Sequence, residues 1–97
     1  MEVFFVYILY SFTSGKSYTG FTNDVQRRLK EHNTTISKGY TLRYRPWILI
    51  REESYSTKAK AIKREKFLKT GRGRDQIKNY ITEFHLNGAV SAAAEKD

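Results

Sequence analysis

The 97-residue chain has no cysteine, one methionine and one proline. Without cysteine it cannot form a disulfide or a thiolate metal site, which suits the reducing cytoplasm. No apolar run approaches the ~20 residues that cross a membrane, and no basic segment precedes the first apolar run, as it would in a signal peptide. We therefore expect a cytoplasmic protein without a membrane partner.

Acidic residues are scarce in the middle of the chain. Residues 34–80 hold thirteen lysines and arginines against four acidic residues, whereas residues 1–33 hold four against three. The net charge of +8 is thus concentrated in one segment. A compact basic band attracts polyanions, so charge favours nucleic acid as the partner over a solvated surface that only keeps the protein soluble.

Three strands are predicted. The run EVFFVYILYS is apolar and rich in aromatic and β-branched residues, which favours a buried central strand. KSYTG follows the turn signal Ser14-Gly15 and predicts the second strand of a hairpin. WILIREE, after Pro46, predicts a third strand.

The segment TNDVQRRLKEH predicts a short helix, with Asn23 as N-cap and Gln26 as its capping-box partner. Its apolar face begins at Val25, and Arg28 and His32 follow along the same face at helical spacing. A guanidinium and an imidazole on the face that should pack against the fold indicate a functional use for both.

Two more helices are predicted after the third strand. The first opens at Ser56 or Thr57 and stops at Gly71, and the second, RDQIKNYITEFHLN, closes at Gly88. The order β-β-α-β-α-α indicates an α+β fold, a small three-stranded sheet flanked by helices. We expect one domain over residues 1–86 and a flexible tail over residues 87–97.

A lone carboxylate lies on the apolar stripe of the second predicted helix. Glu65 is at helical spacing from Ala61, Ile62 and Leu68. A carboxylate placed there is partly desolvated, which costs free energy unless it is paired or binds a metal. A structural salt bridge to Lys69 is the alternative to a metal.

The hairpin tyrosines share a face in only one of two registers. A loop over residues 12–15 puts Leu9 opposite Tyr18 and brings Tyr7 to the same face as Tyr18. A loop of three residues puts the two tyrosines on opposite faces. The sequence leaves both registers open.

A coherent set for phosphodiester cleavage is formed by Tyr7, Tyr18, Arg28, His32 and Glu65. A carboxylate can hold Mg²⁺, which polarises a phosphate and stabilises the leaving oxygen. The arginine fork matches a phosphate. A phenol can orient or deprotonate water when cations lower its pKa, and an imidazole can carry the proton away.

These residues resemble the GIY-YIG nuclease family. The match is carried by VYI at 6–8, YTG at 18–20, Arg28 and His32 four residues apart, and Glu65 on a later helix. It is most similar to the short stand-alone bacterial members, relatives of the nuclease domain that acts in the excision pathway of DNA repair. The resemblance implies a three-stranded antiparallel sheet and hydrolysis of DNA with one Mg²⁺ or Mn²⁺ ion.

The resemblance also implies roles for single residues. Tyr7 would help to activate water and Tyr18 would lie near the scissile phosphate. Arg28 would be the transition-state arginine, His32 would orient a tyrosine, and Glu65 would be the metal ligand.

Two further positions are implied, and two parts of the pattern differ. Gly20 would let the backbone pass close to the site, and Asn79 is the nearest match to a late asparagine of the family. The first motif lacks the family's glycine and isoleucine, and Thr19 stands where the second usually has isoleucine. Neither difference removes a chemical group from the proposed centre.

Other residues are expected to hold nucleic acid rather than to cleave it. Aromatic and cationic side chains alternate in a predicted loop over residues 34–46, and such a pattern can stack bases and hold phosphates. Tyrosines of this loop that only cover the core are the alternative. With one cation from the second helix, the candidates are Tyr40, Arg43, Tyr44, Arg45 and Lys63.

The sequence therefore predicts a metal-dependent endonuclease acting on DNA, with RNA left open. The alternative is a nucleic-acid-binding module with the same fold and little or no cleavage. Since no separate DNA-binding domain is evident, a protein partner that supplies target choice also remains open.

Overall fold

The computed structural model describes residues 2–36, 38–88 and 90–93. Along the chain its elements are β1 (Phe4–Ser11), β2 (Lys16–Thr22), α1 (Val25–Lys30), the π-helix η1 (Glu31–Thr35), α2 (Tyr40–Arg43), β3 (Ile48–Tyr55), α3 (Lys58–Leu68), α4 (Gly71–Asn87) and β4 (Ser91–Ala93). None of the helices in these residues is long and apolar enough to cross a membrane.

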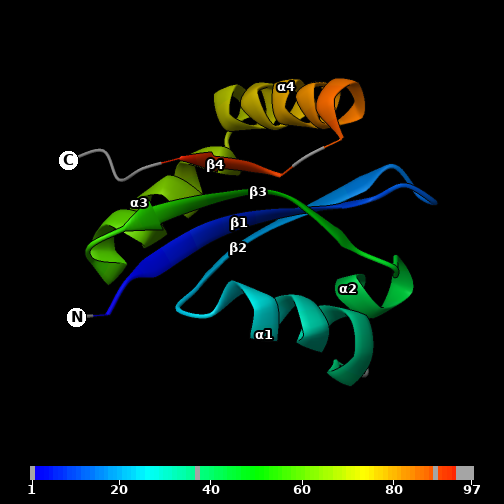
Figure 1. Ribbon diagram of the computed structural model, residues 1–97, viewed down its shortest axis with the longest axis horizontal. Coiled ribbons are helices and arrows are strands. Elements are labelled where there is room, and N and C mark those ends of the chain that lie inside the picture. The colour runs from blue at the N-terminus through cyan, green and yellow to red at the C-terminus, as the bar shows by residue number, and fades with distance from the viewer. Residues whose placement is uncertain (1, 37, 89, 94–97) are drawn as a thin grey trace.

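The sheet has the strand order β2-β1-β3-β4 (Figure 1). β1 is central and pairs antiparallel with both β2 and β3. The predicted α+β fold with a three-stranded antiparallel sheet, in the order β-β-α-β-α-α, is confirmed.

β4 was not predicted. It adds to the far side of β3 as a short parallel strand, with Glu52 opposite Ala92. Residues 89 and 94–97 of the expected tail lie outside the described residues.

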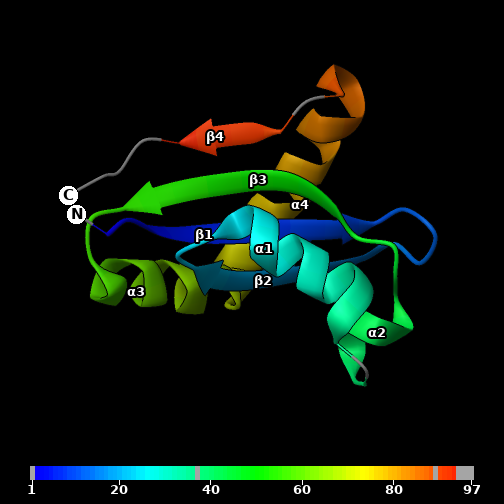
Figure 2. The same ribbon diagram turned by 60° about the horizontal axis from the view of Figure 1, so that its bottom comes forward.

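Side chains of β1 alternate between two cores, because successive residues of a strand point to opposite faces. Val6 and Ile8 pack with residues of β3, α3 and α4, whereas Tyr7 and Leu9 pack with residues of β2, α1 and β3. Helices therefore cover both faces of the sheet, with α3 and α4 on one and α1 on the other (Figures 1 and 2). Tyr7 therefore lies on the face of the sheet that α1 covers, the helix that carries Arg28.

A buried carboxylate anchors α3 to the sheet. Glu53 of β3 is 3% exposed and accepts hydrogen bonds from Arg51, Arg64 and Tyr55. Burial alone would raise the pKa of Glu53, but the bonds from Arg64 and Arg51 outweigh it and lower that pKa to about 2. Arg64 lies next to Glu65 in α3, so this network also fixes the helix that carries Glu65.

Two predicted helix boundaries are wrong. The N-cap of α1 is Asp24, whose carboxylate accepts from the Arg27 backbone N–H at 3.1 Å, and not Asn23. Asn23 instead accepts from the Arg27 guanidinium. The end of α3 is also misplaced, because α3 stops at Leu68 and Gly71 begins α4.

Other boundaries agree with the sequence or add to it. Thr57, one of the two predicted caps, accepts from the Lys60 backbone N–H, and Gly88 ends α4 with φ 65°. Inside the predicted loop, Gly39 precedes the short helix α2.

We expect Gly73→Ala to destabilise the fold. A Cβ at Gly73 would collide with the Phe67 carbonyl oxygen and the Leu68 Cα, because α3 and α4 meet there backbone to backbone. Overpacking of this kind costs about 1–3 kcal/mol in the free energy of unfolding. Gly71→Ala is the matched control, since a Cβ there meets nothing within 4 Å. Urea denaturation of both variants measures the difference, and equal stabilities would contradict the close approach.

Candidate active site

The hairpin adopts the register that brings the tyrosines together. Tyr18 lies opposite Leu9, and Tyr7 lies opposite Gly20, so the loop covers residues 12–15. Of the two registers that the sequence left open, this one places both tyrosines on the α1 face. Their ring centroids are 6.3 Å apart.

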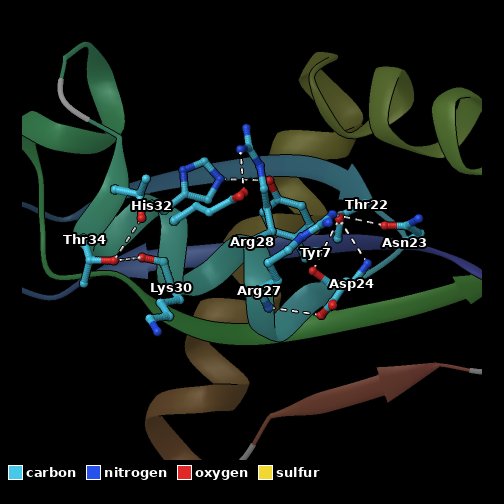
Figure 3. A network of polar contacts seen from close by, with 11 residues as sticks. Tyr7, Thr22, Asn23, Asp24, Arg27, Arg28, Lys30, His32 and Thr34 are labelled. Atoms are coloured by element: carbon cyan, nitrogen blue, oxygen red, sulfur yellow. Dashed lines mark hydrogen bonds and ion pairs between the residues drawn. The ribbon is translucent and has the colours of Figure 1, made fainter.

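A buried hydrogen bond joins Tyr7 to His32. Tyr7 Oη and His32 Nε2 are 2.9 Å apart, and the two residues are 2% and 1% exposed (Figure 3). The His32 ring also lies 4.8 Å from the Tyr18 ring. Three rings from β1, β2 and η1 thus form one packed cluster.

His32 is presented by a π-turn rather than by a continued α-helix. Ile36 N–H donates to the Glu31 carbonyl, the spacing of a π-helix, at 2.9 Å. Arg45 holds this turn from outside, because its guanidinium donates to the backbone carbonyls of His32 and Ile36. Such turns are frequent at functional sites, and here the turn aims an imidazole at the sheet.

Gly20 makes room for the Tyr7 ring. A Cβ at this position would lie 2.5 Å from Tyr7 Oη and 2.7 Å from its Cζ. Any side chain at Gly20 would therefore displace the hydroxyl that reaches His32. This close approach is a physical reason for the glycine in the YTG sequence.

Arg28 lies over the Tyr7 hydroxyl, where Figure 3 shows the two side chains side by side. Its side chain is 36% exposed, and its Nη1 donates to Glu31 at 3.0 Å. Burial disfavours the charged guanidinium, but the bonds to Glu31 and Tyr7 outweigh burial and raise the pKa of Arg28. Sequence reasoning missed Glu31, although its i,i+3 spacing from Arg28 is the signal for such a pair.

Burial shifts the titration of Tyr7 and His32 in opposite directions. Burial raises the pKa of Tyr7 to about 12, against the opposing effect of the Arg28 guanidinium. Burial also lowers the pKa of His32 to about 4, with the positive charges of Arg28 and Arg45 acting in the same direction. The imidazole is therefore neutral at pH 7. Its Nδ1 is buried without a hydrogen-bond partner among the described residues.

Glu65 acts on this cluster from α3. Its negative charge is one of the causes that raise the pKa of Tyr7, so the carboxylate lies within electrostatic reach of the phenol. Its side chain is 16% exposed and pairs with the 57% exposed Lys69 at 3.4 Å. The alternative salt bridge therefore exists, but it is long and open to solvent on the lysine side.

A metal ion here would depend on Glu65 as its protein ligand. Within residues 2–36, 38–88 and 90–93, no group of three or more histidines or carboxylates could hold a metal. Mg²⁺ commonly binds one or two carboxylates, substrate phosphates and several waters. A partly buried carboxylate paired with the exposed Lys69 at 3.4 Å fits that kind of ion.

Only some of the residues expected to contact nucleic acid lie together on the surface. Tyr40 is 45% exposed and lies 4.9 Å from the Tyr44 ring, and both line a hollow of about 590 Å³ with the exposed Arg43. Arg45 instead turns inward to the η1 carbonyls. Lys63 is exposed on α3.

Asn79 is not gathered with Tyr7. It is an exposed residue of α4, which packs against β3 and α3. Those contacts belong to the core on the opposite face of the sheet from Tyr7.

We expect His32 to make the fold sensitive to mild acid. The unfolded chain takes up a proton near pH 6.5, whereas folded His32 takes one up only near pH 4, so the unfolded state binds more protons in between. Stability should therefore fall as pH falls through this window, by up to about 3 kcal/mol at ~1.4 kcal/mol per pKa unit. Urea denaturation of the wild type and His32→Gln over this range measures the difference.

The control for this prediction is His85→Gln, on the exposed part of α4. It should keep the pH dependence of the wild type. A His32→Gln variant with the full wild-type pH dependence would show that another group is responsible.

Comparisons with known proteins identify a family for the chain. Residues 3–90 match the model of the GIY-YIG catalytic domain. A UPF0213 protein of Staphylococcus epidermidis is 38% identical over 78 residues, 80% of this chain and 94% of that protein. A UPF0213 protein of Staphylococcus aureus is 41% identical over 70 residues, 72% of this chain and 84% of that protein. No solved structure matches. With a catalytic-domain match over almost its whole length, the chain belongs to the GIY-YIG nuclease family.

Proposed function

We propose that the protein is a divalent-metal-dependent endonuclease that hydrolyses phosphodiester bonds in DNA. The observation that carries this proposal is the buried Tyr7–His32 hydrogen bond with Arg28 directly above it. The arrangement combines a water-orienting hydroxyl, a neutral imidazole and a phosphate-binding cation in one place.

In the proposed reaction, Tyr7 and His32 move one proton. A water molecule next to Tyr7 Oη gives its proton to that oxygen while the phenol proton passes to His32 Nε2. The resulting hydroxide attacks phosphorus, the P–O bond to the leaving oxygen breaks, and solvent protonates that oxygen. The relay requires the His32 tautomer with its proton on Nδ1. The relay avoids a free phenolate, which a Tyr7 pKa of about 12 disfavours, and the His32 pKa of about 4 means that the imidazole gives the proton up again readily.

Arg28 has two effects in this proposal. Its charge favours a developing negative charge on Tyr7 Oη, as its effect on the Tyr7 pKa indicates. Its planar fork also suits the phosphate oxygens. Glu31 occupies that fork in the free protein, so substrate has to compete with this carboxylate.

Glu65 would hold Mg²⁺ or Mn²⁺, which supplies polarisation of the phosphate and stabilisation of the leaving oxygen. To do so it exchanges its 3.4 Å contact with Lys69 for the ion. An exposed pair of this kind contributes at most about 1 kcal/mol, so the exchange costs little.

DNA as substrate is supported by charge and by an exposed aromatic residue. The chain carries a net charge of +8, and the exposed Tyr40 lines one hollow together with Tyr44 and the exposed Arg43. The proposed setting is the cytoplasm. A chain without cysteine needs no oxidising compartment to fold. A protein partner that selects the target is part of this proposal.

We expect Tyr7→Phe and Arg28→Lys to lose cleavage. Tyr7→Phe removes the hydroxyl from the proton relay, and loss of such help costs about 10²–10⁴-fold in rate. Arg28→Lys keeps the charge but loses the fork. Single-turnover cleavage of one oligonucleotide at saturating enzyme measures the chemical step without the binding defect.

Arg27→Ala is the matched control for these variants. Arg27 is exposed and its guanidinium bonds Asn23 instead of the tyrosines. It should cleave at nearly the wild-type rate. If Arg27→Ala were inactive while Tyr7→Phe and Arg28→Lys cut normally, the site would be assigned to the wrong helix face.

We expect Glu65→Gln to abolish metal-dependent cleavage without unfolding the protein. The change keeps the shape of the side chain, and loss of the solvent-exposed Lys69 pair should cost at most about 1 kcal/mol. DNA binding in EDTA should be equal or tighter, because a negative charge near the phosphate is gone. Thermal melts, binding and cleavage with Mg²⁺ and Mn²⁺ are measured together.

Glu83→Gln, an exposed change on α4 with the same loss of charge, serves as control. It should cut like the wild type. A Glu65→Gln variant that cuts at the wild-type rate in Mg²⁺ would refute the ligand role.

A further inference from the structure

A second basic hollow lies along β2, the strand at the end of the described sheet. Its volume is about 810 Å³. One wall is the start of β2 with Tyr40, and the other is the end of α3 with one face of α4. In Figure 2 the end of α3 lies next to β2, and the two elements are in contact. We call this hollow the β2-edge groove.

Four cations line the β2-edge groove, and none of its lining residues is acidic. These cations are Lys16, Lys69, Arg74 and Lys78. All four side chains are exposed. Within residues 2–36, 38–88 and 90–93, neither Arg74 nor Lys78 forms an ion pair. Unpaired charges of one sign around a concavity raise the local potential and attract polyanions.

The groove is continuous with the candidate active site. Tyr18 lines it and also packs 4.8 Å from the His32 ring. Lys69 lines it one helical turn after Glu65, to which it is paired. A polymer whose phosphate lies at Tyr18 and Arg28 therefore has a cationic path along β2.

The surface between the cations suits sugars better than it suits an acidic peptide. Half-buried Ile81 supplies apolar area in the lining, with the buried Leu68 and Ile77 behind it, and Tyr40 closes one end with its hydroxyl bonded to the Ser17 carbonyl. Nucleic acid offers regularly spaced phosphates joined by sugars, which match alternating charged and apolar surface.

We propose that the β2-edge groove binds the sugar-phosphate backbone that flanks the scissile phosphate, through Lys16, Lys69, Arg74 and Lys78. This inference rests on the proposed nuclease function. It assigns a binding role to α4 and to the hairpin, outside the residues that carry out the chemistry.

The test compares two double variants that remove the same charge from exposed helix positions. Arg74→Ala/Lys78→Ala removes two of the four cations that line the groove. Arg72→Ala/Lys66→Ala removes one exposed cation from each of α4 and α3 that does not line the groove. Fluorescence anisotropy in EDTA measures the Kd for a labelled DNA oligonucleotide over a series of salt concentrations. Single-turnover cleavage in Mg²⁺ measures the rate at saturating enzyme.

The groove variant should bind DNA roughly tenfold more weakly than the wild type. Its salt slope should be shallower by about 1.4–1.8, since each lost phosphate contact removes about 0.7–0.9. The control pair should change the Kd by less than about threefold. The control pair should keep the saturated cleavage rate, because neither Arg72 nor Lys66 lines the groove or belongs to the candidate active site.

Three results would overturn the inference. If both pairs weakened DNA binding equally, the effect would be one of general charge and not of the groove. Cleavage by the wild type in the same experiment would leave the proposed function standing. Polyglutamate that competes as well as DNA of equal charge, and loses binding in the groove variant alone, would make the groove an acidic-peptide site. A wild type that neither binds nor cuts DNA would remove the proposed function and this inference with it.

Discussion

The hydrogen bond between Tyr7 Oη and His32 Nε2 ties the central strand to the π-turn that covers it. Two other features of the α1 face allow this hydrogen bond to form. Gly20 leaves the space through which the Tyr7 ring reaches across β2, and Arg45 holds the turn that presents His32. Because both partners are buried, loss of one leaves the other without its hydrogen-bond partner, which costs about 1–3 kcal/mol. The same contact therefore serves stability and the proposed chemistry.

Successive side chains of β1 point to opposite faces of the sheet, which separates the candidate active site from the apolar core. Val6 and Ile8 face an apolar cluster, and the polar network around Glu53 fixes α3 on that side. Tyr7, one residue away, faces the site. Glu65 belongs to the helix on the apolar side and still acts on Tyr7 from there. The position of the carboxylate thus depends on how firmly Arg64 binds Glu53.

Local pattern predicted β1, β2, β3, α1, α3 and α4 and the residues that meet in the site, because burial and helical phase are properties of neighbouring residues. It failed where two local signals compete or where the deciding contact is distant. Asn23 and Asp24 are both good N-caps, and only the structure shows which carboxylate or amide reaches the Arg27 N–H. Gly71 resembles a helix stop, yet Thr70 caps a new helix there, because its side chain accepts from the Gly73 backbone N–H. The π-turn and the parallel pairing of β4 leave no comparable local pattern.

The net charge of the chain overstates the cations that are open to a polyanion. In the basic segment, Arg51 and Arg64 are bound by Glu53, and Arg45 is bound by backbone carbonyls. These guanidiniums hold the fold together, although composition counts them equally with the rest. Lysines and arginines without such partners remain for a ligand, and several of them gather along β2 beside Tyr18. Since attraction over a surface follows the charges that are left uncompensated, the path of a bound polyanion follows these side chains rather than the basic segment as a whole.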